Sequence, residues 1–201
     1  MRSKAESSRR SRRRTEPAVE DPQRAVLGAW DTNVRVTSFL FEVLPDDLWE
    51  APVPGVPRKS IRTIAAHLHN SRRAWTRTLG RENGIAVPES VDRLRVRREK
   101  LLSVLPHSGA GIRALLELGL EHGGRIPAPP AYVWRNLPLD VAHVLAYFAA
   151  HEAHHRGQIL LIARQLGRPL ARETSGELWE WTRRSREAAA APAAPRRAGR
   201  R

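Results

Sequence analysis

Four long segments of this chain repeat apolar residues at helical spacing, and prolines or glycines separate them. In the first segment Val26, Trp30 and Val34 recur every four residues, which places them on one face of a helix. The alternating runs that would indicate strands are not found. The pattern predicts an all-α fold in which four helices form a bundle. The expected helices cover residues 22–44, 60–79, 90–105 with a bent continuation at 112–121, and 138–166, and a short helix follows at 177–186.

The basic character of the chain is concentrated at its two ends. The formal net charge is +14, yet residues 1–20 hold seven Lys or Arg against three Glu, and residues 186–201 hold five Arg against one Glu. Neither end has the apolar residues of a packed core, so we expect two disordered basic tails around one folded domain at 21–185. Loose contact of the tails with nucleic acid is one interpretation of this charge, and solubility is the simpler one.

The composition also excludes several kinds of site. The chain contains no cysteine, so a metal site would have to use His, Asp or Glu. The absence of cysteine also excludes a disulfide and a cysteine nucleophile. No run of about 18 apolar residues is present, so we expect no membrane-spanning helix. The arginines near the N-terminus lack the apolar stretch of an export signal. These features together predict a cytoplasmic protein.

Two histidines interrupt the apolar face of the last long segment. On a helical wheel His155 lies near the centre of this face, and His151 lies within about 50° of it. Residues four positions apart stack on the same side of a helix, so the two imidazoles can share one metal ion. A single buried histidine is more often a packing residue with its own polar partners, but two at this spacing favour a metal site.

A third ligand is expected from another helix, because bundles build metal sites from side chains on facing helices. The segment at 60–79 offers His67 and His69. They lie on opposite flanks of its apolar face, each about 100° from the centre. Helical periodicity therefore cannot choose between them.

Two motifs in the chain resemble those of a known family. Residues 151–159 read HEAHHRGQI, and residues 61–70 read IRTIAAHLHN, followed by Trp75. They are similar to the last-helix and second-helix motifs of the DinB/YfiT-like superfamily. The Trp-Glu-Trp at 179–181 looks like the aromatic ending of some members. The resemblance covers nearly all of the expected folded part.

The resemblance implies a four-helix bundle, usually a homodimer, with a divalent metal ion such as zinc or nickel at one end. It identifies His67, His151 and His155 as the ligands and leaves His69 as a solvent-exposed residue or a neighbour of the ligands. Some members transfer small thiols such as bacillithiol or mycothiol to electrophilic substrates, and others are treated as metal-dependent hydrolases. The expected function is a thiol S-transferase, with a hydrolase or a non-enzymatic metal-binding bundle as alternatives.

Three neighbours of these histidines are candidate catalytic residues. Glu152 could act as a base or orient a ligand, and Gln158 could orient a ligand through a hydrogen bond. Arg156 could bind a carboxylate of the thiol, although an ion pair with an acidic group on another helix is its simpler role. His151, Glu152 and His155 also match the His-Glu-x-x-His pattern of zinc peptidases, in which the Glu is the general base. The lack of a predicted strand that could align a peptide weakens this last alternative.

Overall fold

The computed structural model of the chain describes residues 21–130, 132–133 and 136–190. Within these ranges the regular structure is helical, and β-type pairing is limited to isolated bridges between loops. The expected all-α fold is confirmed. No helix in the described part of the chain has the length and apolar character needed to cross a membrane.

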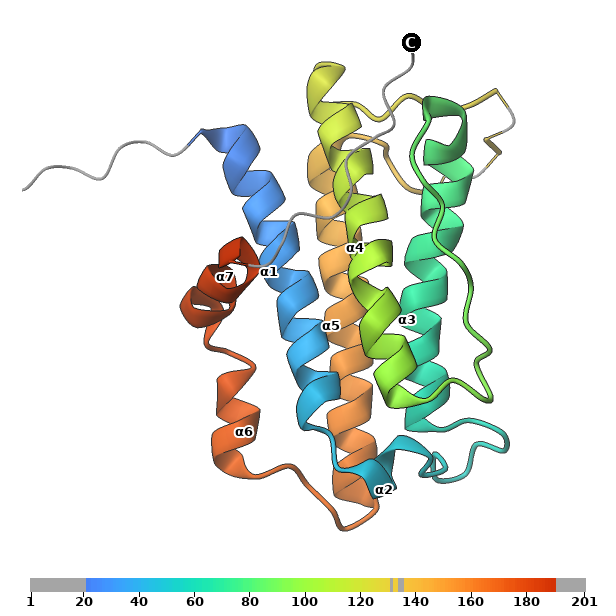
Figure 1. Ribbon diagram of the computed structural model, residues 1–201, viewed down its shortest axis with the longest axis vertical. Coiled ribbons are helices and arrows are strands. Elements are labelled where there is room, and N and C mark those ends of the chain that lie inside the picture. The colour runs from blue at the N-terminus through green and yellow to red at the C-terminus, as the bar shows by residue number, and fades with distance from the viewer. Residues whose placement is uncertain (1–20, 131, 134–135, 191–201) are drawn as a thin grey trace, which may run out of the picture.

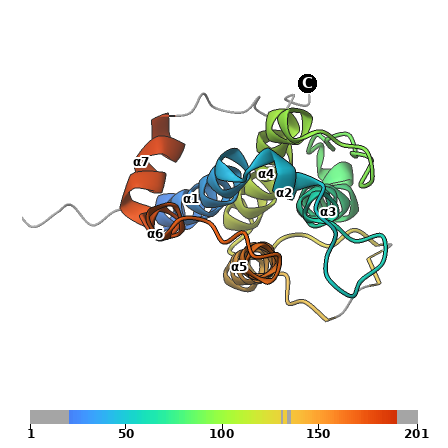
Figure 2. The same ribbon diagram turned by 90° about the horizontal axis from the view of Figure 1, so that it is seen from below.

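Four long helices pack side by side as a bundle (Figure 1), namely α1 (Pro22–Val43), α3 (Ile61–Trp75), α4 (Arg98–Glu121) and α5 (Val141–Gln165). Seen from one end, α1, α4 and α3 form an arc, and α5 lies on the other side of them, opposite the space between α1 and α3 (Figure 2). One face of α5 is therefore turned toward α3. The shorter elements are α2 (Asp46–Trp49), a π-helical turn η1 (Thr76–Gly80) that extends α3, and a 3₁₀ turn η2 (Arg81–Asn83).

A buried polar layer divides the core of the bundle into two apolar clusters. One cluster is built from the C-terminal half of α1 and the N-terminal half of α3, and the other lies toward the opposite ends of these helices. Polar groups buried between apolar clusters are stable only when they bond to one another. The layer consists of Asn33 and Thr37 on α1, His69 and Arg72 on α3, Ser108 on α4 and Glu152 on α5, all buried.

Helix α4 begins at Arg98 and not near Ser90, so the predicted start is wrong. Residues 90–97 lie outside any helix, and Arg97 is the N-cap of α4. Backbone groups of this segment bond to side chains of other elements. For example, the Asn70 side chain makes hydrogen bonds of 2.9 and 3.0 Å with the backbone of Val91. Such contacts exist only once α3 is in place, and here they override the local helical pattern.

The predicted break in the middle of this helix is also wrong, because α4 continues through Pro106. A Cβ atom on Gly111 would lie only 2.5 Å from Oγ1 of Thr76, and one on Gly109 would lie 3.0 Å from Cγ1 of Val34. The two glycines therefore let α4 approach its neighbours closely and do not end it. A sequence pattern cannot distinguish these two uses of glycine.

Two short helices follow α5, where the sequence predicts a single one. They are α6 (Arg172–Glu177) and α7 (Trp181–Ala190), and α7 lies against the outer side of α1 (Figure 2). The Arg184 side chain is 1 % exposed, and its guanidinium group lies 4.1 Å from the centroid of the Phe39 ring. Helix α7 includes residues 186–190, which the sequence assigns to the C-terminal tail. The rest of both expected tails lies outside the described residues.

Candidate metal centre

Three histidine side chains from two helices converge between α3 and α5. His67 lies near the middle of α3, and His151 and His155 occupy successive turns of α5. The Nε2 atom of His151 is 3.2 Å from the Nε2 atom of His67 and 3.2 Å from that of His155. These residues, called the histidine trio below, are partly buried.

The spacing of the three nitrogen atoms suits one divalent metal ion. Imidazole nitrogens bind zinc at about 2.0–2.1 Å, so three of them around a tetrahedral ion lie about 3.3 Å apart. The two observed separations of 3.2 Å are close to this value. The histidine trio could therefore hold an ion and leave its fourth position open to water or a substrate.

Burial keeps the imidazoles of the histidine trio neutral. Desolvation by burial, and then the neighbouring His155 and His151, lower the pKa of His67 to about 4. Desolvation is also the largest cause that lowers the pKa of His151 and of His155. Neutral imidazole is the form that binds a metal ion. At neutral pH the histidine trio can therefore bind an ion without first releasing protons.

The lowered pKa values predict that bound metal is retained in mildly acidic solution. Protons compete for an imidazole only below its pKa, which is 6.5 for an ordinary histidine and about 4 for His67. The protein should therefore lose its metal at a lower pH than a site built from histidines of ordinary pKa would. Metal content after dialysis at a series of pH values measures this, and loss with a midpoint near the ordinary histidine pKa would contradict it.

The lowered pKa of His67 should also make the stability of the metal-free protein depend on pH. Between the ordinary histidine pKa and about 4, the unfolded chain binds a proton at residue 67 that the folded chain does not bind. The free energy of unfolding should therefore fall as the pH falls through this window. A His67→Gln variant removes this titration, so its melting temperature should depend less on pH over the same range.

Gln158 forms a hydrogen bond with His155. Its Oε1 atom lies 2.9 Å from Nδ1 of His155, and its Nε2 atom lies 2.9 Å from Nε2 of His154. A carbonyl oxygen can only accept, so Nδ1 of His155 carries the proton and donates it in this bond. The Nε2 atom of His155 then keeps the lone pair that a metal ion needs.

Comparison with known proteins identifies the family of this chain. The sequence model of the DinB family matches residues 20–187. The chain belongs to the DinB family. No curated protein matches this DinB family chain. The assignment confirms the resemblance carried by the motifs around His67 and His155, and the histidine trio is compatible with a metal-dependent DinB protein.

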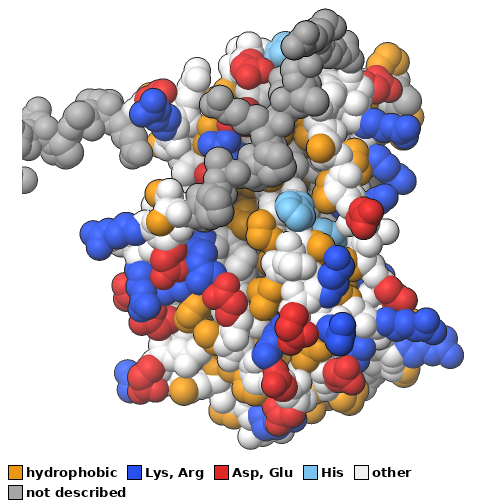
Figure 3. Space-filling view, in the orientation of Figure 1, with side chains coloured by type: hydrophobic (Ala, Val, Ile, Leu, Met, Phe, Trp, Pro, Cys, Tyr) orange, Lys and Arg blue, Asp and Glu red, His pale blue; other side chains and the backbone are white. Residues whose placement is uncertain are grey.

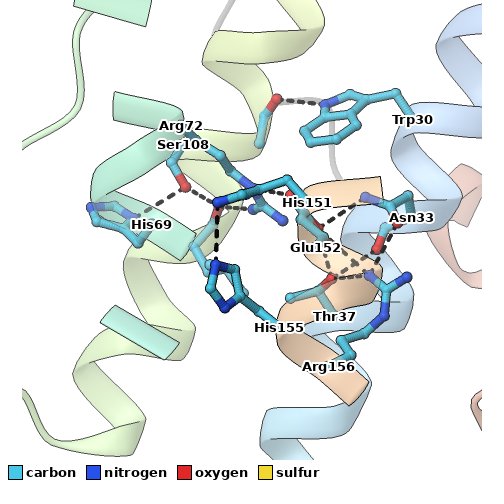
Figure 4. A network of polar contacts seen from close by, with 12 residues as sticks. Trp30, Asn33, Thr37, His69, Arg72, Ser108, His151, Glu152, His155 and Arg156 are labelled. Atoms are coloured by element: carbon cyan, nitrogen blue, oxygen red, sulfur yellow. Dashed lines mark hydrogen bonds and ion pairs between the residues drawn. The ribbon is translucent and has the colours of Figure 1, made fainter. Parts of the chain in front are cut away.

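Glu152 and Arg156 of this DinB family chain point into the polar network of the core (Figure 4). Glu152 is 0 % exposed, and its Oε1 atom lies 2.6 Å from Nε of Arg72. Its Oε2 atom accepts hydrogen bonds from Nδ2 of Asn33 at 2.9 Å and from Oγ1 of Thr37 at 2.7 Å. Arg156 donates to the side-chain oxygens of the same two residues of α1, at 3.0 and 2.7 Å.

These contacts change the roles that the sequence allows for the two residues. Both carboxylate oxygens of Glu152 are engaged by donors on α1 and α3, whereas the general base of a zinc peptidase must face the reacting water. The guanidinium group of Arg156 likewise bonds to α1, through its Nη1 atom. The geometry supports a positioning role, in which Glu152 and Arg156 fix α5 against α1 and α3.

His69 is buried, so the first of the two alternatives expected for it, exposure to solvent, is wrong. It is 0 % exposed, and its Nε2–H donates to the backbone oxygen of Glu89 at 2.8 Å. Its Nδ1 atom lies 3.1 Å from Oγ of Ser108, whose hydroxyl can donate to it (Figure 4). Both ring nitrogens therefore have partners apart from the histidine trio. His69 links α3 to α4 and to the loop that precedes it.

The sequence analysis does not identify Asn33, Thr37 or Arg72, although a signal exists for the first two. They are polar residues four positions apart on the face of α1 that Trp30 and Leu40 define. This is the spacing that singles out the two histidines of α5. Polar pairs within an apolar face thus mark a buried network as well as a metal site.

Proposed function

We propose that this DinB family protein is a metal-dependent enzyme that transfers a small thiol to an electrophilic substrate. His67, His151 and His155 would hold a zinc or nickel ion. The proposal is carried by the convergence of their neutral Nε2 atoms at a partly exposed position between α3 and α5. An ion with three neutral ligands and an open position is a Lewis acid that favours the thiolate form of a thiol near neutral pH.

Two neighbouring residues restrain the histidines. Gln158 sets the tautomer of His155 through the hydrogen bond to Nδ1. Tyr147 stacks on His151, with ring centroids 6.0 Å apart and ring planes inclined by 8°, which restrains that imidazole. The chain contains no cysteine, so the thiol has to be a co-substrate. The family resemblance implies a thiol of the bacillithiol or mycothiol type.

The proposal extends to the setting in which the enzyme works. We propose a homodimer in the cytoplasm, whose folded domain at 21–185 is flanked by the two basic tails. On the face shown in Figure 3, Lys and Arg side chains are interspersed with Asp and Glu side chains. This face therefore lacks the continuous basic surface typical of a nucleic-acid-binding domain. Contact with nucleic acid would be weak and limited to the tails.

A conjugation assay tests the proposed reaction. The purified protein would be loaded with zinc or nickel and mixed with a fluorogenic electrophile such as monochlorobimane and a panel of cellular thiols. We expect conjugation of at least one thiol, its loss on removal of the metal, and its return on reloading. A loaded protein that conjugates no thiol but hydrolyses an activated ester would favour the hydrolase alternative. A loaded protein inactive in both assays would contradict an enzymatic role.

A further inference from the structure

A cavity of about 490 Å³ lies between α1 and α7 and is called the α1–α7 cavity below. Small-molecule sites in proteins typically have volumes of about 300–1,000 Å³, so this cavity is large enough for a ligand. Helix α7 lies beyond α1 on the side away from α3 (Figure 2). The cavity shares no residue with the histidine trio, so a ligand bound there would occupy a second, separate site.

Small residues form the α1 side of this cavity. Ala25, Gly28 and Ala29 lie on one face of the helix, and a Cβ atom on Gly28 would have no neighbouring side chain within 4 Å. On α4, by contrast, a Cβ atom on Gly111 or Gly119 would lie 2.5 or 2.6 Å from another side chain. Glycine lowers the stability of a helix relative to alanine, and close packing does not require it at position 28. Gly28 therefore leaves open a space that α7 does not fill.

The α7 side of the cavity carries polar groups without partners. It is lined by Trp181, Thr182, Ser185 and Arg186. Among the described residues, neither hydroxyl group forms a hydrogen bond, and no carboxylate lies within 4.0 Å of the Arg186 guanidinium nitrogens. The neighbouring Arg184, by contrast, pairs with two carboxylates at 3.1 Å. None of the lining residues is acidic, so the cavity favours an anion over a cation.

The opposite face of α7 holds this helix in place. The Arg184 side chain is buried with its guanidinium group over the Phe39 ring of α1, and Glu187 pairs with Arg35 of α1 at 2.7 Å. Both residues point away from the cavity, because they lie about half a turn from the lining residues on the helical wheel. The walls are therefore fixed before a ligand binds, which lowers the entropic cost of binding.

We propose that the α1–α7 cavity binds a small aromatic carboxylate. The carboxylate pairs with Arg186 and accepts hydrogen bonds from the hydroxyl groups of Thr182 and Ser185. The flat ring covers Gly28 and packs against Trp181, whose side chain offers an apolar surface for it. Inorganic phosphate would leave the apolar half of the cavity empty, so the shape favours an anion with a flat apolar body. This site is independent of the metal ion and of the proposed transferase reaction.

Calorimetry with the metal-free full-length protein tests this inference. The metal ion is removed because a carboxylate can also bind to it. The probes are 2-naphthoate and the neutral 2-naphthalenemethanol, which share one ring system and differ in charge. We expect naphthoate to bind about tenfold more tightly than the alcohol at low salt, because a charge-assisted hydrogen bond to Arg186 strengthens its binding. This advantage should shrink as the ionic strength rises.

Two variants test the two sides of the cavity. Gly28→Leu fills the space above α1, so it should weaken the binding of both probes at least tenfold. Its matched control is Ala150→Leu, which adds the same side chain to an exposed position of α5 and should bind both probes as the wild type does. Arg186→Gln should remove only the advantage of naphthoate, whereas Arg164→Gln, at an exposed position of α5, should keep it. Thermal unfolding followed by circular dichroism checks that each variant is folded.

Three results would overturn the inference. They are no binding of naphthoate by the wild type, unchanged binding by a folded Gly28→Leu variant, and an advantage of naphthoate that survives in Arg186→Gln. The His151→Ala variant should bind naphthoate as the wild type does, and weaker binding there would assign the ligand to the histidine trio instead. Because no metal ion and no thiol is present, a negative result leaves the proposed transferase function untouched.

Discussion

The His151→Ala variant should lose nearly all of its bound metal ion. His151 is the central member of the histidine trio, since its Nε2 atom is 3.2 Å from the Nε2 atoms of both His67 and His155. Loss of a residue that only orients a ligand weakens metal binding roughly 10- to 100-fold, so loss of a ligand should exceed about 100-fold. Metal content after purification, and competition with a chelator, measure the effect.

The matched control is His154→Ala, which changes an exposed histidine on the same helix. It should retain stoichiometric metal, because His154 lies outside the histidine trio, which it contacts only through Gln158 and through the edge of the His155 ring, with ring centroids 5.1 Å apart. Thermal unfolding of both metal-free variants checks that the bundle is intact. An unchanged metal stoichiometry in His151→Ala would show that the histidine trio is not the ligand set.

Replacement of Glu152 by alanine should destabilise the bundle by about 3–5 kcal/mol. The Arg72 side chain is 1 % exposed and lies 2.6 Å from the Glu152 carboxylate, so the variant leaves a buried guanidinium group without its counter-charge. At about 2–4 °C per kcal/mol for a domain of this size, the melting temperature should fall by roughly 10 °C. Urea unfolding of the metal-free protein measures the free energy directly.

A surface ion pair provides the comparison for this effect. Glu42 pairs with Arg35 at 2.8 Å in a partly exposed position, so Glu42→Ala should cost less than about 1 kcal/mol. The Arg72→Met/Glu152→Leu double variant should recover part of the stability, because removal of both partners leaves neither of these charges buried alone. Equal stability of Glu152→Ala and Glu42→Ala would contradict the importance that we assign to the polar layer.

The features that the sequence predicts correctly depend on residues close together in the chain. The shared face of His151 and His155 follows from the helical repeat alone. The lengths of α1, α3 and α5 follow from apolar spacing, and the side chains of Asp21 and Ser60 cap α1 and α3. The fold class follows in turn from the number and length of these helices.

The features that the sequence leaves open or misses depend on how the helices are arranged around the bundle. His67 and His69 flank the same apolar face, and periodicity treats them alike. In the structure the His67 flank faces α5, whereas the His69 flank faces Ser108 on α4. The order of helices around the axis decides which flank meets α5, and no local pattern encodes that order. The close approach of Gly111 on α4 to Thr76 cannot be predicted from the sequence for the same reason.

The buried polar layer has a consequence for how the ion enters and leaves. Apolar side chains can exchange partners when one helix slides along another, but such a shift would carry the Arg72 guanidinium away from Glu152 and into hydrocarbon. The layer therefore opposes sliding of α3 along α5. It thereby fixes the position of His67 relative to His151 along the bundle axis. We therefore expect a metal ion to bind to ligands that are already in position. Exchange of one ion for another should leave the packing of α3 against α5 unchanged.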